Sequence, residues 1–217
     1  MLIAFDLDDT LIDTSGAVTP YKLREVINLL LERGINIGSF STAIQEMEAL
    51  DKTCVTSKDT VRLTLERYQA LHLIDDAYAL YSMPLPKDFM IPTTPHAKKV
   101  LQILRQRGYI LTIVTGGKRA YQLEKLEKAG LEPSIFSKIS IPEDSKKRPH
   151  YEDLLKEFLV PPRECIAVGD RIPMDLAPAH ELGFRTVHMR WGRGLRWNKE
   201  DWVDYSIHEL SELLEIL

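Results

Sequence analysis

Residues 2–10 read LIAFDLDDT, and the fold prediction begins from this stretch. The apolar run of residues 2–5 is followed at once by Asp6, Asp8 and Asp9. A short apolar run that stops abruptly at polar residues is typical of a buried strand. Because alternate side chains of an extended chain point the same way, Asp6 and Asp8 can reach one substrate. An Asp-x-Asp pair by itself is more typical of a turn or a helix N-cap.

Four later segments share this pattern of an apolar run that stops at polar or glycine residues. They are residues 109–114, 135–141 in weaker form, 165–168 and 184–189. Between them, apolar residues recur at the spacing of amphipathic helices. Strands that alternate with helices build a parallel, doubly wound sheet, whose ligand crevice lies beyond the carboxyl ends of the strands. We therefore predict an α/β fold of this kind.

Residues 14–92 interrupt the alternation, because helical patterns dominate them. The apolar residues that carry those patterns are Leu23, Ile27, Leu30, Leu31, Val61, Leu65 and Tyr68. Prolines at positions 84, 86, 92 and 95 cannot continue a helix and mark the return to the sheet. We predict a core domain of residues 1–13 and 93–217, with an inserted helical domain of residues 14–92.

The composition is that of an ordinary globular protein of 217 residues, with 44% hydrophobic and 28% charged residues and a formal net charge of -4. These values exclude a largely disordered chain. No apolar run approaches the roughly 18 residues that span a bilayer, and the first residues do not resemble a signal peptide. Cys54 and Cys165 are too few for a disulfide framework. We expect a cytoplasmic protein with reduced thiols.

The mild negative charge also argues against binding of nucleic-acid phosphates. A basic and aromatic patch does run through residues 190–197. A surface loop whose long side chains lie along the protein explains that patch more simply. The six histidines show no metal-ligand spacing, so we interpret them as structural or surface groups.

Polar groups follow three of the predicted strands. Asp6 and Asp8 follow the first, Thr115 follows the second, and Asp170 with Asp175 follows the fourth. In a parallel sheet these strand ends meet in one crevice. Carboxylates crowded together resist ionisation unless a divalent cation neutralises them. Oxygen-only ligands favour Mg²⁺, which retains waters and binds substrate phosphate.

Taken together, these segments resemble the four ordered motifs of the haloacid dehalogenase superfamily. The matching segments are residues 6–10 (DLDDT), residues 113–117 (IVTGG), the lysine pair Lys146 and Lys147, and residues 168–171 (VGDR) with Asp175. Each motif is weak alone, but the ordered set is specific and covers most of the chain. The resemblance implies a Rossmann-like core with a helical cap inserted after the first motif.

The resemblance also implies a role for each acidic residue. Asp6 would be the nucleophile that forms an aspartyl-phosphate, which water then hydrolyses. Asp8 would be the acid and base of the two half-reactions. Mg²⁺ would be held by the Asp6 carboxylate, the Asp8 backbone carbonyl and Asp170, with Asp175 orienting the site.

Thr115 and the Gly116 backbone N–H would bind phosphoryl oxygens, and a lysine would neutralise charge on the transferring group. Lys146 and Lys147 are both candidates for that lysine. The family places it shortly before a helix that starts with proline, here Pro149, and the spacing favours Lys146. We therefore assign Lys146 to substrate binding and catalysis and keep Lys147 as the alternative.

Residues 35–41 offer a competing second motif, because they also resemble a strand that ends in a hydroxyl group. We prefer Thr115, since residues 109–114 are more apolar and precede the lysine pair. The simpler interpretation of residues 35–41 is a connection between two helices of the insertion.

The predicted function is a Mg²⁺-dependent phosphatase that acts on a small phosphorylated metabolite. Asp8 argues against a dehalogenase, because haloacid dehalogenases lack an acid/base aspartate at that position. Two alternatives stay open: a phosphosugar mutase of the same fold, and a phosphate-sensing or protein-binding module without catalysis. We expect no nucleic-acid or membrane partner, and either a monomer or a homodimer.

Overall fold

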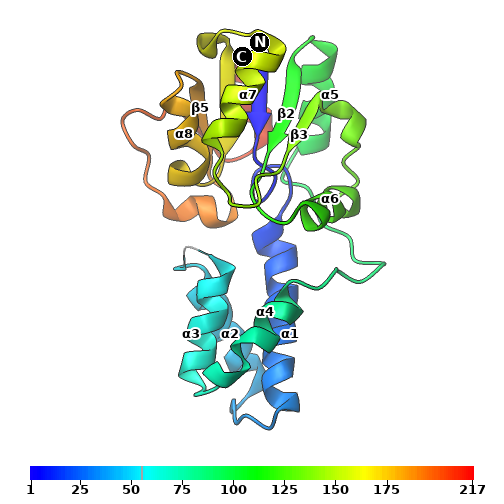
Figure 1. The fold of residues 1–217 in the computed structure, drawn as a ribbon, viewed down its shortest axis with the longest axis vertical. Helices are drawn as coiled ribbons and strands as arrows, with labels where there is room; N and C mark the ends of the chain where they lie inside the picture. Colours follow the sequence, from blue (N-terminus) through cyan, green and yellow to red (C-terminus); the bar gives the residue numbers. More distant parts are fainter. Residues whose placement is uncertain (55) are drawn as a thin grey trace. The chain divides into compact units, whose positions relative to one another are not determined.

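The computed structural model describes residues 1–54 and 56–217 of the chain (Figure 1). It divides into two compact units. One consists of Met1–Thr14 together with Asp88–Leu217, and the other of Ser15–Lys87. The first contains the sheet, and the second is helical.

The first unit contains a six-stranded parallel sheet among the described residues, in the order β3-β2-β1-β4-β5-β6. The strands are β1 (Leu2–Phe5), β2 (Ile110–Val114), β3 (Lys138–Ser140), β4 (Cys165–Gly169), β5 (Arg185–Met189) and β6 (Tyr205–Ile207). The helices of this unit are α5 (Ala97–Gln106), α6 (Arg119–Lys128), α7 (Arg148–Phe158), α8 (Ala177–His180) and α9 (Leu213–Ile216). The predicted α/β fold with a doubly wound parallel sheet is confirmed.

The central strands β1 and β4 are buried along their whole length. Parallel strands covered on both faces read as continuous apolar runs, which explains why these two were recognisable in the sequence. On one face Leu2 and Ala4 pack in a cluster with Tyr151 and Leu154 of α7 and with Leu176. The parallel pairing of β1 with β4, which ends at Phe5 and Val168, places the carboxyl ends of the two strands beside each other.

The predicted strands agree with the structure except at the edges of the sheet. The segment 135–141 is reduced to β3, because Pro133–Ile135 forms a 3₁₀ turn instead. The short edge strand β6 was not predicted. The expected last helix over residues 210–217 begins as a 3₁₀ turn, Leu210–Glu212, before α9.

The helical unit consists of α1 (Thr19–Glu32), α2 (Phe40–Asp51), α3 (Ser57–Arg67) and α4 (Ile74–Tyr81), among the residues that the structure describes. Its apolar core includes Leu23, Leu30, Met47 and Leu65, and none of these is more than 1% exposed. Residues 35–41 connect α1 to α2 and enter its first turn, in agreement with the simpler interpretation of that segment.

The helical unit ends at Lys87, whereas the predicted insertion runs to residue 92. The difference has a physical cause, because the returning chain pairs with the loop after β1. Asp13 N–H donates to Pro92 O at 2.8 Å, and Thr94 Oγ1 donates to Thr10 O at 2.7 Å. These bonds make the return segment part of the sheet-containing unit.

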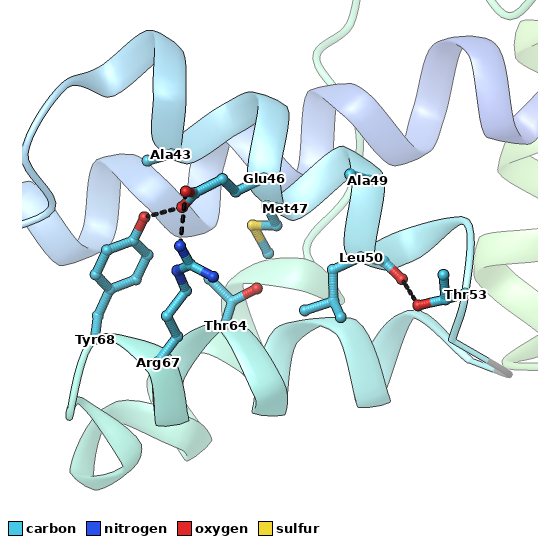
Figure 2. A pocket seen from close by; sticks show the side chains of 9 residues that line it. All are labelled: Ala43, Glu46, Met47, Ala49, Leu50, Thr53, Thr64, Arg67 and Tyr68. Carbon is cyan, nitrogen blue, oxygen red and sulfur yellow. Dashed lines mark hydrogen bonds and ion pairs between the residues drawn. The ribbon is translucent and has the colours of Figure 1, made fainter.

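The helical unit has a hollow of about 360 Å³ between α2 and α3. Figure 2 shows the side chains that line it. Its lining residues are Ala43, Glu46, Met47, Ala49, Leu50, Thr53, Thr64, Arg67 and Tyr68. The Glu46 carboxylate is neutralised by Arg67 Nη2 at 2.7 Å, and it also accepts a hydrogen bond from Tyr68 Oη at 3.3 Å. None of these lining residues is one that the sequence assigns to the catalytic site.

Among the described residues, no helix has the length and apolar character that a membrane crossing requires.

Candidate active site

Three buried aspartates converge at the carboxyl ends of β1 and β4. One carboxylate oxygen from each of Asp6, Asp170 and Asp175 lies within 4.8 Å of the other two. Their exposed fractions are 1%, 2% and 1%. Buried carboxylates at this separation repel each other, so the arrangement needs positive charge to be stable.

The backbone explains why the aspartates meet. Phe5 of β1 pairs with Val168 of β4, and Asp6 N–H donates to Val168 O at 2.8 Å. Asp175 lies in the helical turn after β4, where its Oδ2 accepts from Arg171 N–H at 2.8 Å. A Cβ on Gly169 would lie 2.5 Å from the Asp175 Cβ, so only glycine lets Asp175 approach β4 this closely.

Lys147 supplies positive charge inside the cluster. Its Nζ lies 2.5 Å from Asp6 Oδ1 and 2.6 Å from Asp175 Oδ1, and its side chain is 1% exposed. Burial alone would lower the pKa of Lys147, but Asp175 and Asp6 raise it well above its usual value. Burial by itself would raise the pKa of Asp175, yet Lys147 and Arg171 hold it below the usual value. Both groups are therefore charged.

Lys147 and Arg171 do not offset the whole negative charge of the three carboxylates. Burial raises the pKa of Asp6 to about 6 despite Lys147, and burial with the neighbouring Asp175 raises the pKa of Asp170. Within the described part of the chain, Asp6 Oδ2 and Asp170 Oδ1 are buried without a hydrogen-bond partner. Orphaned carboxylate oxygens are the ligand type that Mg²⁺ prefers. The residues present therefore fit a divalent cation held by Asp6 and Asp170.

Asp8 has a different environment from Asp6. Lys125 Nζ lies 2.5 Å from its Oδ1 and 2.6 Å from its Oδ2. Gln122 Nε2 donates to Oδ2 at 3.0 Å, and Thr14 Oγ1 donates to Oδ1. Although burial would raise the pKa of Asp8, Lys125 outweighs it and holds the pKa well below its usual value. Asp8 is therefore an ionised carboxylate in this arrangement.

Thr115 and Gly116 form the loop that follows β2. Thr115 is 1% exposed, and its Oγ1 accepts a hydrogen bond from Gln122 Nε2 at 2.8 Å. A Cβ on Gly116 would lie 2.7 Å from Ser145 Oγ, so the loop approaches the Ser145 segment only because this residue is glycine. The hydroxyl of Thr115 is thus fixed by a neighbour that also binds Asp8.

Comparison with known proteins decides the family, because residues 1–183 match the family model of the haloacid dehalogenase-like hydrolases. The chain belongs to this family. A glyceraldehyde 3-phosphate phosphatase of Pyrococcus furiosus is 32% identical to the chain over 228 residues, which cover 100% of this chain and 92% of the relative. The enzyme of the same name from Methanocaldococcus jannaschii is 30% identical over 99% of this chain and 96% of its own length. The chain is a phosphatase of the haloacid dehalogenase-like hydrolases.

Solved structures support the fold of this family member. A phosphatase of the haloacid dehalogenase superfamily from Thermococcus onnurineus superposes with a TM-score of 0.66, at 22% identity, over 99% of this chain and 96% of that one. A dehalogenase solved as an intermediate complex gives a TM-score of 0.61 at 17% identity, over 100% of this chain and 96% of that one. Such distant structures establish the shared fold and no more than that.

The structure brings together most of the residues that the sequence singled out. Asp6, Asp170 and Asp175 form the acidic cluster. Gln122 joins Asp8 to Thr115. The preference for Lys146 needs correction, since it is exposed whereas Lys147 contacts Asp6.

The correction has a simple geometric reason. The prediction measured the spacing from a helix start at Pro149, whereas α7 begins one residue earlier, at Arg148. Lys147 therefore occupies the N-cap position and is buried, while Lys146 lies one residue outside it. The backbone of Lys146 is used instead, because its N–H donates to Asp144 Oδ1 at 3.0 Å.

The structure also reveals two site residues that sequence reasoning missed, Gln122 and Lys125 of α6. Both are buried, at 3% and 4% exposure, on the same face as Leu126 and Ala129. The sequence did hold a signal, because positions 122, 125, 126 and 129 follow the spacing of a buried helix face. Two polar residues on such a face need buried partners, and here the main one is Asp8.

The basic and aromatic patch of residues 190–197 packs partly against the loop after β1. Trp191 Nε1 donates to Asp13 Oδ1 at 2.9 Å, and Arg193 N–H donates to Asp9 Oδ2 at 3.3 Å. The Arg196 guanidinium lies 4.8 Å from the centre of the Trp197 ring. The patch therefore holds Asp9 and Asp13, which belong to the loop after β1.

Proposed function

We propose that this phosphatase hydrolyses a small phosphomonoester with Mg²⁺, through a phosphorylated Asp6. The observation that carries the proposal is the environment of Asp6. Its carboxylate is buried, one oxygen contacts Lys147, and the other has no hydrogen-bond partner in the described part of the chain. A carboxylate has two oxygens, so one oxygen of Asp6 can attack phosphorus while the other faces the metal, and Lys147 offsets their charge.

In the first half-reaction, an Asp6 oxygen attacks the phosphorus atom and the bond to the substrate's ester oxygen breaks. Asp8 gives a proton to that oxygen, which leaves as an alcohol. Because Lys125 holds the pKa of Asp8 well below its usual value, Asp8 must gain a proton before this step. The monoanion of a phosphomonoester, whose second pKa is about 6, carries such a proton, and its transfer to Asp8 requires that one of the hydrogen-bond donors on Asp8 give way. Lys147 offsets negative charge at the attacking group throughout.

In the second half-reaction, water attacks the phosphorus of the aspartyl-phosphate and gives a proton to Asp8. Inorganic phosphate leaves and the Asp6 carboxylate is restored. Thr115 and Gly116 would bind the phosphoryl oxygens in both steps. Mg²⁺, held by Asp6, Asp170 and the Asp8 carbonyl with Asp175 nearby, would supply the charge that lets an anionic carboxylate meet an anionic phosphoryl group.

The relatives narrow the substrate class that we propose. The alignments with the relatives named glyceraldehyde 3-phosphate phosphatase cover 99% and 100% of this chain. A phosphoglycolate phosphatase of Haemophilus influenzae is 24% identical over 100% of this chain. Glyceraldehyde 3-phosphate and phosphoglycolate are both short-chain phosphate esters. We therefore propose a phosphorylated metabolite of two or three carbons as the substrate.

The test is phosphate release from glyceraldehyde 3-phosphate, phosphoglycolate and p-nitrophenyl phosphate, with Mg²⁺ or with a chelator. We expect turnover that requires Mg²⁺ and that falls at least about 10⁴-fold in Asp6→Asn. The matched control is Asp153→Asn, because Asp153 is exposed on α7 and should behave as wild type. Phosphate release that survives in Asp6→Asn would reject Asp6 as the nucleophile, and transfer to another hydroxyl without release would indicate a mutase.

A binding measurement separates the metal site from the activity. At about 100 times its dissociation constant, Mg²⁺ should stabilise the folded protein by about 2.7 kcal/mol. Thermal unfolding with and without Mg²⁺ measures this shift, and Asp170→Asn should reduce it. An equal shift in both proteins would show that Asp170 does not hold the metal.

A further inference from the structure

We propose that Lys125 and Gln122 are positioning residues for Asp8, so that α6 sets the orientation of the group that transfers protons. This inference rests on the proposed function, in which Asp8 protonates the leaving oxygen. Neither residue belongs to the four motifs, and both reach the site from one face of a helix.

Lys125 makes the stronger of the two contacts. Its side chain is 5% exposed, and its Nζ lies 2.5 Å and 2.6 Å from the two oxygens of Asp8. A buried ammonium group is costly unless a carboxylate pairs with it, so this pair is strongly constrained. Because one nitrogen contacts both oxygens, it fixes the direction in which the carboxylate points.

Gln122 links Asp8 to the proposed phosphate-binding loop. Its Nε2 lies 3.0 Å from Asp8 Oδ2, 2.8 Å from Thr115 Oγ1 and 2.7 Å from Gly116 O, so its two hydrogens are shared among three acceptors. One side chain therefore sets the spacing between the proton-transfer group and the residues that would bind phosphoryl oxygens.

The resulting network surrounds the carboxylate of Asp8. Oδ1 accepts from Thr14 and Lys125, and Oδ2 accepts from Gln122 and Lys125. The Asp8 side chain is nevertheless 25% exposed, so one side of it is accessible to a substrate. These donors fix the orientation of Asp8, and one of them must give way when the carboxylate carries a proton, because a carboxylate has about four lone-pair sites.

Positioning makes a prediction that a purely structural role does not. Proton donation to the leaving oxygen matters most when that oxygen leaves as a poor leaving group. If Asp8 is displaced, phenyl phosphate should lose more rate than p-nitrophenyl phosphate, whose phenolate leaves more easily. The two esters have nearly the same shape, so a general loss of folding or binding would affect both equally.

The experiment measures kcat/KM of the full-length, Mg²⁺-loaded enzyme for both esters in wild type, Lys125→Met and Gln122→Met. We expect a loss of about 10²-fold or more for phenyl phosphate in Lys125→Met, and a loss at least about tenfold smaller for p-nitrophenyl phosphate. Gln122→Met should show the same difference together with a higher KM for both esters, because Gln122 also fixes Thr115.

The matched control is Lys128→Met, the same substitution on the same helix, which should leave both values unchanged. Lys125→Arg keeps the charge and should restore part of the selective loss. Equal losses on the two esters, no loss, or a faster reaction in Lys125→Met would each overturn the proposal. If Lys125→Met does not fold, Gln122→Met and Lys125→Arg decide it. Full activity in Asp6→Asn would instead reject the proposed function itself.

Discussion

Lys146 and Lys147 are neighbours in the chain, but only Lys147 lies within 2.6 Å of two buried carboxylates. Replacing it with Met would leave Asp6 and Asp175 without their buried cation. We expect Lys147→Met to lower activity at least about 10²-fold and to destabilise the fold by about 3–5 kcal/mol. Lys146→Met should change neither by much, because Lys146 is exposed.

Steady-state kinetics with p-nitrophenyl phosphate and urea unfolding of the two variants measure these effects. A large loss of activity in Lys146→Met alone would restore the sequence-based preference. Activity is expressed per amount of folded protein, because the expected destabilisation of Lys147→Met would by itself lower the yield of active enzyme.

At the residue scale, the sequence could predict which polar residues lie at the ends of strands, because the residue type and its place after an apolar run are enough. Asp6, Asp8, Thr115 and Asp170 each follow a strand, and a parallel sheet brings strand ends together. Sequence could not choose between adjacent lysines, because that choice depends on where a helix starts. It also missed Lys125, whose proposed role follows from a contact with a residue 117 positions away along the chain.

At the scale of single elements, the edge strand β6 depends on a side-chain contact. Asp204 Oδ2 accepts from Thr186 N–H of β5 at 2.7 Å and from Thr186 Oγ1 at 3.0 Å. Thr186 is fully buried, so losing the acceptor would leave its donors unsatisfied. We expect Asp204→Ala to destabilise the protein by about 1–3 kcal/mol without a selective effect on catalysis.

Urea unfolding of Asp204→Ala beside Asp201→Ala tests this contact. Asp201 is an exposed aspartate three residues earlier and should tolerate the change. If the two variants are equally stable, the hydrogen bonds to Thr186 do not stabilise the edge of the sheet.

The same contact explains why β6 escaped prediction. A strand of three residues is too short to show a period, and Tyr205 and Ser206 are at least partly accessible to solvent. Its pairing with β5 is specified by Asp204, which lies outside the strand. The central strands were predictable for the opposite reason, since burial on both faces requires continuous apolar runs. Predictability therefore falls from the centre of the sheet to its edges.

At the scale of the whole molecule, the chain forms a helical unit and a sheet-containing unit. The helical unit is one continuous segment, Ser15–Lys87, with its own apolar cluster. The sheet-containing unit is formed from two segments, and it holds the acidic cluster. The break in strand–helix alternation was enough to predict an insertion, whereas its end depended on hydrogen bonds of the return segment that no local pattern encodes.

This division predicts that damage to the helical core will leave the proposed metal site intact. Leu30 is fully buried in that core, whereas the next residue, Leu31, is 45% exposed. Leu30→Ala should destabilise the helical unit by about 2–5 kcal/mol, and Leu31→Ala should have a much smaller effect. Differential scanning calorimetry with and without Mg²⁺ distinguishes the two units. The stabilisation by Mg²⁺ should persist in Leu30→Ala, because its proposed ligands all lie in the other unit, and its disappearance would show that the metal site depends on the helical core.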